Sequence, residues 1–151
     1  MNISTLNTCI GKLWLEADKK YLRRISFLPL EGNNISTPVL ELAKQELEEY
    51  TNGKRQFFTV PILAKGSPFQ EKIWSCLQRI PYGKVWTYRQ LAEAAEYPSA
   101  FRAAGNANHA NPLPIIIPCH RVINSNGDIG GYGGGREIKQ KLLNLEAFVT
   151  F

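Results

Sequence analysis

The sequence predicts a mixed α/β protein (α+β), in which a small N-terminal domain of antiparallel sheet plus helix precedes a helical, winged-helix-like C-terminal domain with a helix-turn-helix. Two observations predict this class. Strand-like segments and turn signals fill the first 28 residues, whereas helix-start signals follow one another after residue 66. At 151 residues the chain is long enough to bury a substantial core. We place the domain boundary at residues 64–66, which separates residues 1–65 from residues 66–151.

The N-terminal part is predicted to be a β-meander followed by a helix. Residues 13–28 hold two strand-like runs around a turn signal at residues 18–20. Thr37 is then a helix N-cap ahead of a proline, and apolar residues at helical spacing continue to a stop at residues 52–53. Residues 57–63 form a further extended piece. No motif here carries chemistry, so this part is predicted to be an α/β scaffold.

The C-terminal part is predicted to be helical. Three helices are expected, over residues 68–80, 88–95 and 100–110, with Ser67, Thr87 and Ser99 as their N-caps. A tight turn joins the second helix to the third, which is the pattern of a helix-turn-helix. Residues 121–129 predict a hairpin-like wing, and residues 136–146 predict a closing helix.

Charge and cysteine content restrict the class of protein. The net charge of +5 and the pI of about 9.2 suit an anionic partner, but the positive excess is spread along both halves. The three cysteines lie far apart, which argues against a disulfide framework and for a reducing compartment. Two histidines and no CxxC motif predict no metal site. Without a signal peptide or an apolar stretch of membrane-spanning length, we expect a soluble intracellular protein.

The chemistry is predicted to centre on Cys119 and His120, which follow the apolar run at residues 115–117. This run is β-branched and bounded by prolines, so it is expected to be a buried strand or extended segment that ends where Cys119 emerges. An imidazole near a thiol favours the thiolate, which is the nucleophilic form. The dipeptide alone favours a buried structural cysteine beside a surface histidine, and it is the surrounding sequence that favours a nucleophile.

A nucleic-acid surface is predicted on the third helix of this part. Arg102 is a single long cation among the small residues Ala103, Gly105 and Ala107. Small residues let a helix approach a partner's backbone closely, although a helix–helix packing face also favours them. The presence of Arg102 favours a nucleic-acid surface over a packing face. The glycine run at residues 130–135 lacks the ending of a phosphate-binding loop, so we expect its backbone to approach a flat ligand, with Tyr132 packing on it.

From residue 67 to residue 146 the chain closely resembles the O6-alkylguanine-DNA alkyltransferases, also called methylated-DNA–protein-cysteine methyltransferases. The matching stretches are residues 83–88, 102–105, 111–112, 115–122 and 130–135. Pro-Cys-His-Arg-Val with an upstream Asn-Pro and an Arg-Ala-x-Gly helix is highly specific. The resemblance implies direct-reversal DNA repair, in which the protein transfers an alkyl group from guanine O6, and less readily thymine O4, to its own cysteine in a single turnover. Residues 66–151 are then the DNA-binding and alkyltransferase domain.

The resemblance also implies the catalytic roles. Cys119 is the acceptor, and its proton passes through a water to His120, which Glu146 holds. Asn111 fixes the turn around the cysteine, and Tyr88 donates to guanine N3 as negative charge develops on the ring. Arg121 is expected to be a structural ion-pair partner for the N-terminal half.

For DNA, the resemblance implies that the helix of Arg102 enters the minor groove, with the arginine filling the stack left by a flipped base. Ala103, Gly105 and Ala107 let that helix lie deep. The backbone carbonyls of Cys119 and Val122 read the guanine amino group, and the loop at Tyr132 and Gly133 contacts O6. Ser125 and the backbone of Tyr88 are implied phosphate contacts. These contacts complete the predicted site, with no cofactor.

The sequence departs from the family in two places. Gly133 stands where many relatives have serine, which leaves only a backbone N–H there and predicts room for bulkier alkyl groups. The zinc ligands of some relatives' N-terminal domains are absent, which agrees with the prediction of no metal. The predicted partner is double-stranded DNA that carries O6-alkylguanine. We expect a monomer with no obligate protein partner and no membrane association, cytoplasmic, or nuclear in a eukaryote.

Three other functions are compatible with parts of the sequence. A non-catalytic lesion-binding relative would lack the reactive cysteine, whereas Cys119 is present. A papain-like hydrolase could recruit Asn111, Cys119 and His120 as a triad, but the adjacency of the last two fits such a triad poorly. A transcriptional regulator would need a dimer interface, and the sequence shows no heptad repeat or clear apolar patch for one.

Overall fold

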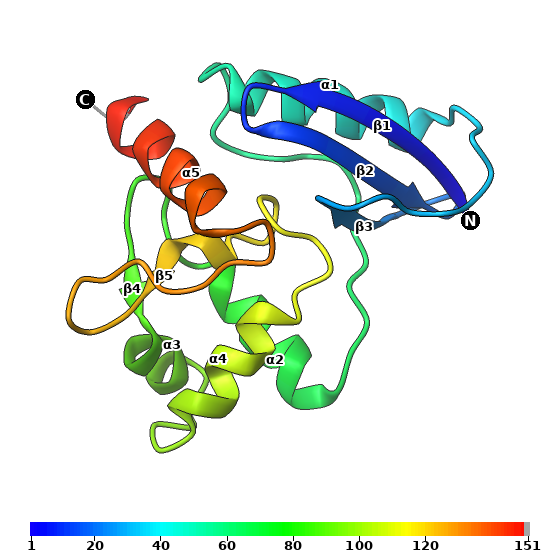
Figure 1. Ribbon diagram of the computed structural model, residues 1–151. Helices are drawn as coiled ribbons and strands as arrows, with labels where there is room; N and C mark the ends of the chain where they lie inside the picture. Colours follow the sequence, from blue (N-terminus) through cyan, green and yellow to red (C-terminus); the bar gives the residue numbers. More distant parts are fainter. Residues whose placement is uncertain (150–151) are drawn as a thin grey trace. The chain divides into compact units, whose positions relative to one another are not determined.

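The computed structural model describes residues 1–149 and forms two compact units, residues 1–64 and the residues from 65 on (Figure 1). In the N-terminal unit, β1 (Asn2–Thr8), β2 (Gly11–Ala17) and β3 (Leu22–Ser26) form an antiparallel sheet in the order β1-β2-β3. Helix α1 (Pro38–Thr51) lies along this sheet. Leucines and a tyrosine from both layers fill the core between them: Leu13, Leu15, Leu22, Leu40, Leu47 and Tyr50.

The predicted meander and helix are confirmed in this unit. The side chain of Thr37 accepts a hydrogen bond from the amide of Leu40, and Pro38 occupies the first turn, where its missing N–H needs no partner. The extended piece at residues 57–63 is not a strand of the sheet; it makes one isolated parallel bridge, between Ile62 and Leu22. The carboxylate of Glu46, 1% exposed, accepts hydrogen bonds from the amides of Thr59 and Val60. These two amides therefore need no strand partner, which explains why the segment does not join the sheet there.

The C-terminal unit is built on three packed helices, α2 (Pro68–Leu77), α3 (Tyr88–Ala94) and α4 (Phe101–His109). Both predicted capping boxes are present: Ser67 pairs with Gln70, and Thr87 pairs with Gln90. The third predicted cap is wrong. Helix α4 has Ala100 at its N-cap, with no side-chain hydrogen bond, so Ser99 does not cap it.

The indole of Trp74 secures the far end of α4. Its Nε1 donates to the carbonyl oxygen of Ala107 at 2.8 Å, which joins α2 to the last turn of α4. Figure 1 shows α3 and α4 connected by a short loop, as in a helix-turn-helix. The C-terminal end of α4 is therefore fixed against α2.

A short two-stranded sheet leads to the site. Strand β4 (Trp86–Thr87) pairs in parallel with β5 (Val122–Ile123), so the prediction of a hairpin-like wing is wrong in its strand pairing. Beyond β5 the chain makes only a turn, closed by a hydrogen bond from the amide of Asn124 to the carbonyl oxygen of Asp128 at 2.9 Å. The loop after it runs to α5 (Arg136–Val149), the predicted closing helix. Among the described residues no helix combines the length and the apolar character that crossing a bilayer requires.

Candidate active site and nucleic-acid interface

Cys119 lies in a turn, so the prediction of a strand before it is wrong. Ile115 adopts a left-handed backbone conformation (φ +78°), and the amide of Ile117 donates to the carbonyl oxygen of Leu113 at 2.9 Å. Three prolines explain the difference, because each lacks the N–H that a sheet would use: Pro112, Pro114 and Pro118. The apolar run is nevertheless buried, and Cys119 opens a short 3-10 helix, η1 (Cys119–Arg121).

Asn111 holds this turn with both ends of its amide. Its Nδ2 donates to the carbonyl oxygen of Ile117 at 2.8 Å, and its Oδ1 accepts from the amide of Leu113 at 2.9 Å. The same side chain hydrogen-bonds the thiol of Cys119. The position of the sulfur is therefore set by a side chain eight residues upstream, which suits a reacting atom that must be placed accurately.

The resting form of Cys119 is the thiol. The residue is 5% exposed, and burial raises its pKa to about 11, against the hydrogen bond from Asn111 and the charge of Lys139, which both lower it. A pKa near 11 leaves roughly one molecule in 10⁴ as thiolate at neutral pH. A reaction through this sulfur needs a group that removes the proton.

His120, Glu146 and Arg121 form a buried cluster. The Nε2 of His120 lies 2.7 Å from Oε2 of Glu146, and Arg121 binds both oxygens of the same carboxylate, at 2.8 and 2.9 Å. Burial raises the pKa of Glu146, but hydrogen bonds from His120 and Arg121 outweigh it and bring the value down to about 2. Glu146 is therefore ionised, and it selects the His120 tautomer with the proton on Nε2.

That tautomer leaves Nδ1 as the basic atom of the imidazole. Burial lowers the pKa of His120, against the hydrogen bond from Glu146, so the ring is neutral at neutral pH and able to accept a proton. Arg121 is bound inside this unit, by Glu146 and by the carbonyl oxygen of Ile80 at 2.7 Å. Arg121 thus pairs with Glu146 within its own unit, and the expected ion pair with the N-terminal half stays a prediction.

Lys139 is a fully buried lysine that the sequence analysis did not identify. Its Nζ donates to the carbonyl oxygens of Val122, at 2.6 Å, and of Gly131, at 3.3 Å. Burial lowers the pKa of Lys139 to about 8, and the negative charge of Cys119 in its thiolate form raises it. The ammonium ion therefore ties β5 to the glycine loop and places a positive charge near the sulfur. The spacing of apolar residues in this helix did not indicate that Lys139 is buried, because a lysine in such a pattern is normally solvated.

Tyr88, the first residue of α3, lies between the loop and α4. A Cβ at Gly130 would come within 3.3 Å of the phenol oxygen, and Gly130 has φ +78°, so this position requires glycine. The ammonium of Lys139 lies 6.0 Å from the ring centroid. Burial, and then the negative charge of Cys119 in its thiolate form, raise the pKa of Tyr88, which keeps the phenol protonated as a hydrogen-bond donor.

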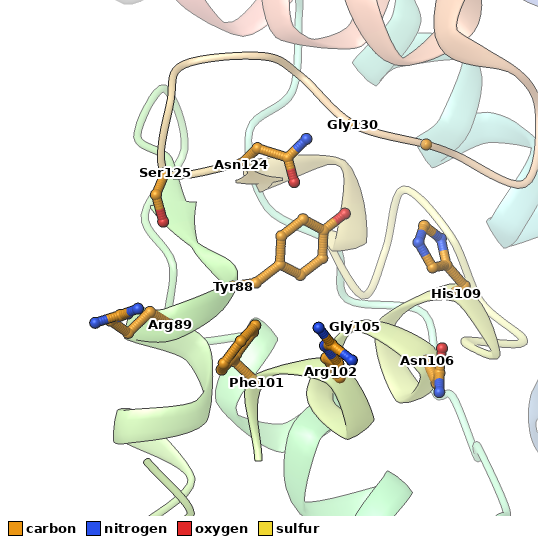
Figure 2. Close-up of a pocket in the computed structure, with 11 residues that line it drawn as sticks. Tyr88, Arg89, Phe101, Arg102, Gly105, Asn106, His109, Asn124, Ser125 and Gly130 are labelled. Atoms are coloured by element: carbon orange, nitrogen blue, oxygen red, sulfur yellow. The ribbon is translucent and has the colours of Figure 1, made fainter. Parts of the chain in front are cut away.

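A pocket of about 330 Å³ opens beside Tyr88. Figure 2 shows the phenol in its centre, with α4 on one side and the Asn124–Gly130 segment on the other. The lining residues are Tyr88, Arg89, Phe101, Arg102, Gly105, Asn106, His109, Asn124, Ser125, Gly130 and Gly131. Cys119 does not line the pocket itself, but the negative charge of its thiolate form would act on Tyr88, which does. A planar group that enters here would meet the phenol first.

Two exposed arginines border this pocket. Arg102 and Arg89 make no ion pair with any residue between 1 and 149, and the guanidinium of Arg89 lies 5.9 Å from the ring centroid of Phe101. Ala103 is also exposed, and Gly105 is half-buried with room for a Cβ. Ala107 is 3% exposed, which does not fit its predicted contact with DNA. The side chain of Ala107 is packed inside the unit, whereas Arg102 lies on its exposed surface.

The remaining residues that were predicted to contact the substrate or DNA differ in their exposure to solvent. Val122 is fully buried and its carbonyl oxygen already accepts from Lys139, so a ligand there would use the second lone pair of that oxygen. The hydroxyl of Tyr132 is buried, and burial raises its pKa well above the usual value. Gly133 is exposed, with no atom within 4 Å of a Cβ, and Ser125 lines the open pocket. The expected tolerance of bulkier alkyl groups at Gly133 stays a prediction.

The structure thus brings Cys119, His120, Glu146, Asn111 and Tyr88 into one unit around a short turn. Two further side chains belong with them, Lys139 and Asn108, whose Nδ2 lies 3.4 Å from the carbonyl oxygen of Cys119. The residue types of Lys139 and Asn108 did not indicate a place in the site. Their burial becomes apparent only when the helices are packed together. Among the described residues, no group of three or more His, Cys, Asp and Glu side chains is placed to hold a metal ion.

We expect Lys139→Met to slow the reaction of Cys119 with iodoacetamide roughly tenfold at pH 8, because a nearby cation favours the thiolate. Peptide mapping of the alkylated residue as a function of pH measures this, in a background where the exposed Cys9 is replaced by serine. Lys141→Met is the matched control, since Lys141 is an exposed lysine of the same helix. An unchanged pH profile in Lys139→Met would contradict the assigned electrostatic role.

Comparisons with known proteins agree over the whole chain. Residues 1–64 match the model of the 6-O-methylguanine DNA methyltransferase, ribonuclease-like domain, and residues 68–148 match that of its DNA binding domain. The constitutive methylated-DNA–protein-cysteine methyltransferase of Bacillus subtilis is 51% identical over 155 residues, which cover 95% of this chain and 93% of that protein. The methyltransferase of Methanosarcina barkeri is 38% identical, with 97% of both chains covered.

A solved structure shows the same fold. The crystal structure of Mycobacterium tuberculosis OGT in complex with DNA matches with a TM-score of 0.90 and 36% identity, over 99% of this chain and 94% of that one. Family models over both units, close relatives of the same length and a shared fold lead to one conclusion. The chain belongs to the 6-O-methylguanine DNA methyltransferase family.

Proposed function

We propose that this protein repairs DNA by direct reversal, taking an alkyl group from O6 of guanine, and less readily from O4 of thymine, onto Cys119. The observation that carries the proposal is the Asn111-held thiol of Cys119, followed directly by a histidine that is bound to a buried carboxylate. Membership of the family and the name shared by its relatives support the same reaction.

The reaction breaks the bond between the alkyl carbon and O6 and forms a bond between that carbon and Sγ of Cys119. Because the thiol is protonated at rest, its proton must leave first. We assign this step to His120, which receives the proton on Nδ1 through a water while Glu146 stabilises the resulting imidazolium. The thioether product is stable, so each chain acts once.

The departing guanine must be stabilised as negative charge develops on its ring. Tyr88 is a protonated phenol in the centre of the pocket, and we assign to it the donation of a hydrogen bond to N3 of the base (Figure 2). The backbone carbonyls of Cys119 and Val122 are the proposed acceptors for the guanine amino group; the oxygen of Cys119 would share its existing hydrogen bonds from Asn108 and the amide of Val122. The loop at Tyr132 and Gly133 is the proposed contact to O6.

The base must leave the duplex before O6 can approach a buried sulfur. We assign extrusion to α4, with Arg102 inserted from the minor groove into the vacated stack. Ala103 and Gly105 on the same helix allow close approach, and Ser125 and the backbone of Tyr88 contact phosphates. The unpaired charges of Arg102 and Arg89 suit this surface, since nucleic-acid affinity depends on cations that are free to meet phosphates.

The proposed partner is therefore double-stranded DNA that carries the lesion, and the protein is proposed to act as a monomer. No cofactor enters the proposed reaction, because the nucleophile, the base and the donor are all side chains of this chain. The proposed site of action is the cytoplasm, where the reducing environment keeps the acceptor thiol free.

Intact-mass spectrometry after incubation with an O6-methylguanine duplex tests the proposal. We expect every active chain to gain the mass of one methyl group, and an undamaged duplex of the same sequence to cause no change. Recovery of hydrolysed peptide or ester products, with no mass gain on the protein, would instead support a hydrolase.

Arg102→Ala is expected to slow repair of the lesion in duplex DNA by roughly 10²-fold, since extrusion of a base costs a few kcal/mol. The same variant should react normally with free O6-alkylguanine base, which needs no extrusion. Arg79→Ala is the matched control, because Arg79 is equally exposed and lies outside the pocket. Equal losses on duplex and free base would show that Arg102 acts in chemistry or folding, contrary to its assignment.

A further inference from the structure

Phe101 is the first residue of α4 and is 41% exposed, although its side chain is large and apolar. A single exposed apolar residue needs no explanation by itself. This one lines the pocket beside Tyr88, and in the described part of the chain no second aromatic ring packs on it (Figure 2). The ring of Phe101 is therefore presented to the open side of a candidate site.

The surroundings of this ring are cationic. The guanidinium of Arg89 lies 5.9 Å from the ring centroid, and Arg102 is the next residue of the helix. Neither arginine forms an ion pair with any residue between 1 and 149, and none of the described residues that line the pocket is acidic. A ring between two free guanidinium groups suits a partner whose charged backbone borders stacked apolar rings, which is the structure of a nucleic-acid groove.

Phe101 and Arg102 would meet different points of that groove. Consecutive residues of an α-helix diverge by about 100° around its axis, so the two side chains cannot enter the same gap. Both nevertheless line one pocket, together with Gly105 and Asn106 one turn further along α4. With Arg102 in the gap left by the extruded base, the ring of Phe101 meets the base step beside it.

We propose that Phe101 is an apolar wedge, a side chain that enters this neighbouring base step from the minor groove and partly unstacks it. Partial unstacking next to the lesion removes one of the contacts that hold the damaged base in the duplex, so the wedge favours extrusion. Arg89, whose guanidinium lies over the ring, is then close to the phosphate backbone. This inference rests on the proposed function, and it adds a residue to DNA recognition with no new reaction.

Affinity and base stacking test the wedge directly. The full chain carries Cys119→Ser as background, so that the bound O6-methylguanine duplex does not react, and 2-aminopurine is placed in turn on each side of the lesion. We expect Phe101→Ala to bind about tenfold more weakly, because the apolar surface of the ring is no longer removed from water. The fluorescence rise on binding should be reduced at one flanking position. Phe101→Leu, which keeps an apolar wedge, should bind within about threefold of the background chain.

The salt dependence of binding separates the ring from the cation above it. Arg89→Met should lower the slope of log affinity against log salt by about one, because it removes a phosphate contact. Phe101→Ala removes no charge and should leave this slope unchanged. If Phe101 served only to hold Arg89 in place, Phe101→Ala would lower the slope as Arg89→Met does, and that result overturns the inference.

Phe57→Ala is the matched control, since Phe57 is an exposed aromatic residue of the N-terminal unit. Phe101→Gln repeats the test with a polar side chain that suits a helix, should Phe101→Ala lower the melting temperature. Binding by both variants within about twofold of the background chain, or unchanged fluorescence at both flanking positions, overturns the inference. Absence of methyl transfer in the chain that retains Cys119 would instead overturn the proposed function. The binding measurements need no transfer, so the two failures are distinguishable.

Discussion

Cys119→Ser is expected to abolish methyl transfer while the fold and the affinity for DNA remain. The two side chains have nearly the same shape, but a hydroxyl is a far weaker acid than a thiol. Burial already raises the pKa of the thiol to about 11, and the same burial would place the alkoxide of a serine out of reach of His120. Mass spectrometry of the protein and a gel-shift assay with lesion duplex measure the two properties separately.

The other cysteines supply the controls for this experiment. Cys9 is exposed in the N-terminal unit, and Cys76 is a buried residue of α2. Cys9→Ser should gain one methyl group as the unmodified chain does. Uptake of a methyl group by Cys119→Ser would show that another residue is the acceptor.

Glu146→Gln is expected to have the second largest effect, because the carboxylate serves two buried partners. Without its charge, the imidazolium of His120 is not stabilised and the Nε2 tautomer is no longer selected, so we expect transfer to slow roughly 10²- to 10⁴-fold. Arg121 is left as a buried cation without its counter-ion, which we expect to lower the free energy of unfolding by about 3–5 kcal/mol. Single-turnover kinetics and denaturant unfolding measure the two losses.

The pH dependence of stability separates Glu146 from other carboxylates. Its pKa is depressed in the fold, from 4.5 to about 2, so its stabilising contribution is complete above about pH 4.5 and is lost as the pH falls toward 2. This contribution amounts to about 3 kcal/mol and should be missing from the acid limb of Glu146→Gln. Glu137→Gln is the control, since Glu137 is an exposed residue of the same helix. An identical acid limb in both variants would contradict the assigned role.

Much of the fold followed from local signals in the sequence. The capping boxes at Ser67 and Thr87 and the cap at Thr37 each satisfy amides that any helix start leaves open, so short-range chemistry was sufficient to predict them. The predictions failed where contacts between residues far apart in the sequence determine the structure. Ser99 had the right residue type but not the backbone position, and residues 115–117 had a strand's composition but form a turn, in which the amide of Ile117 bonds the carbonyl oxygen of Leu113.

The candidate site divides in the same way. The motif around Cys119 and the helix of Arg102 were predicted through resemblance to a family, because their roles depend on a substrate that the sequence does not contain. Lys139 and Asn108 were missed, since a lysine and an asparagine in helical segments are usually solvated. The ion pair of Arg121 with Glu146 was also missed, because the two residues are far apart along the chain. Packing of α4 and α5 around the cysteine turn creates all three.

The central claim is that one sulfur accepts one alkyl group and is then spent. Incubation of the protein with an excess of duplex that carries isotope-labelled O6-methylguanine, followed by peptide mapping, tests it most directly. We predict that label transfer stops at one methyl group per chain, all of it in the peptide that contains Cys119. Transfer that continues past one group per chain, or label on any other residue, would contradict the account.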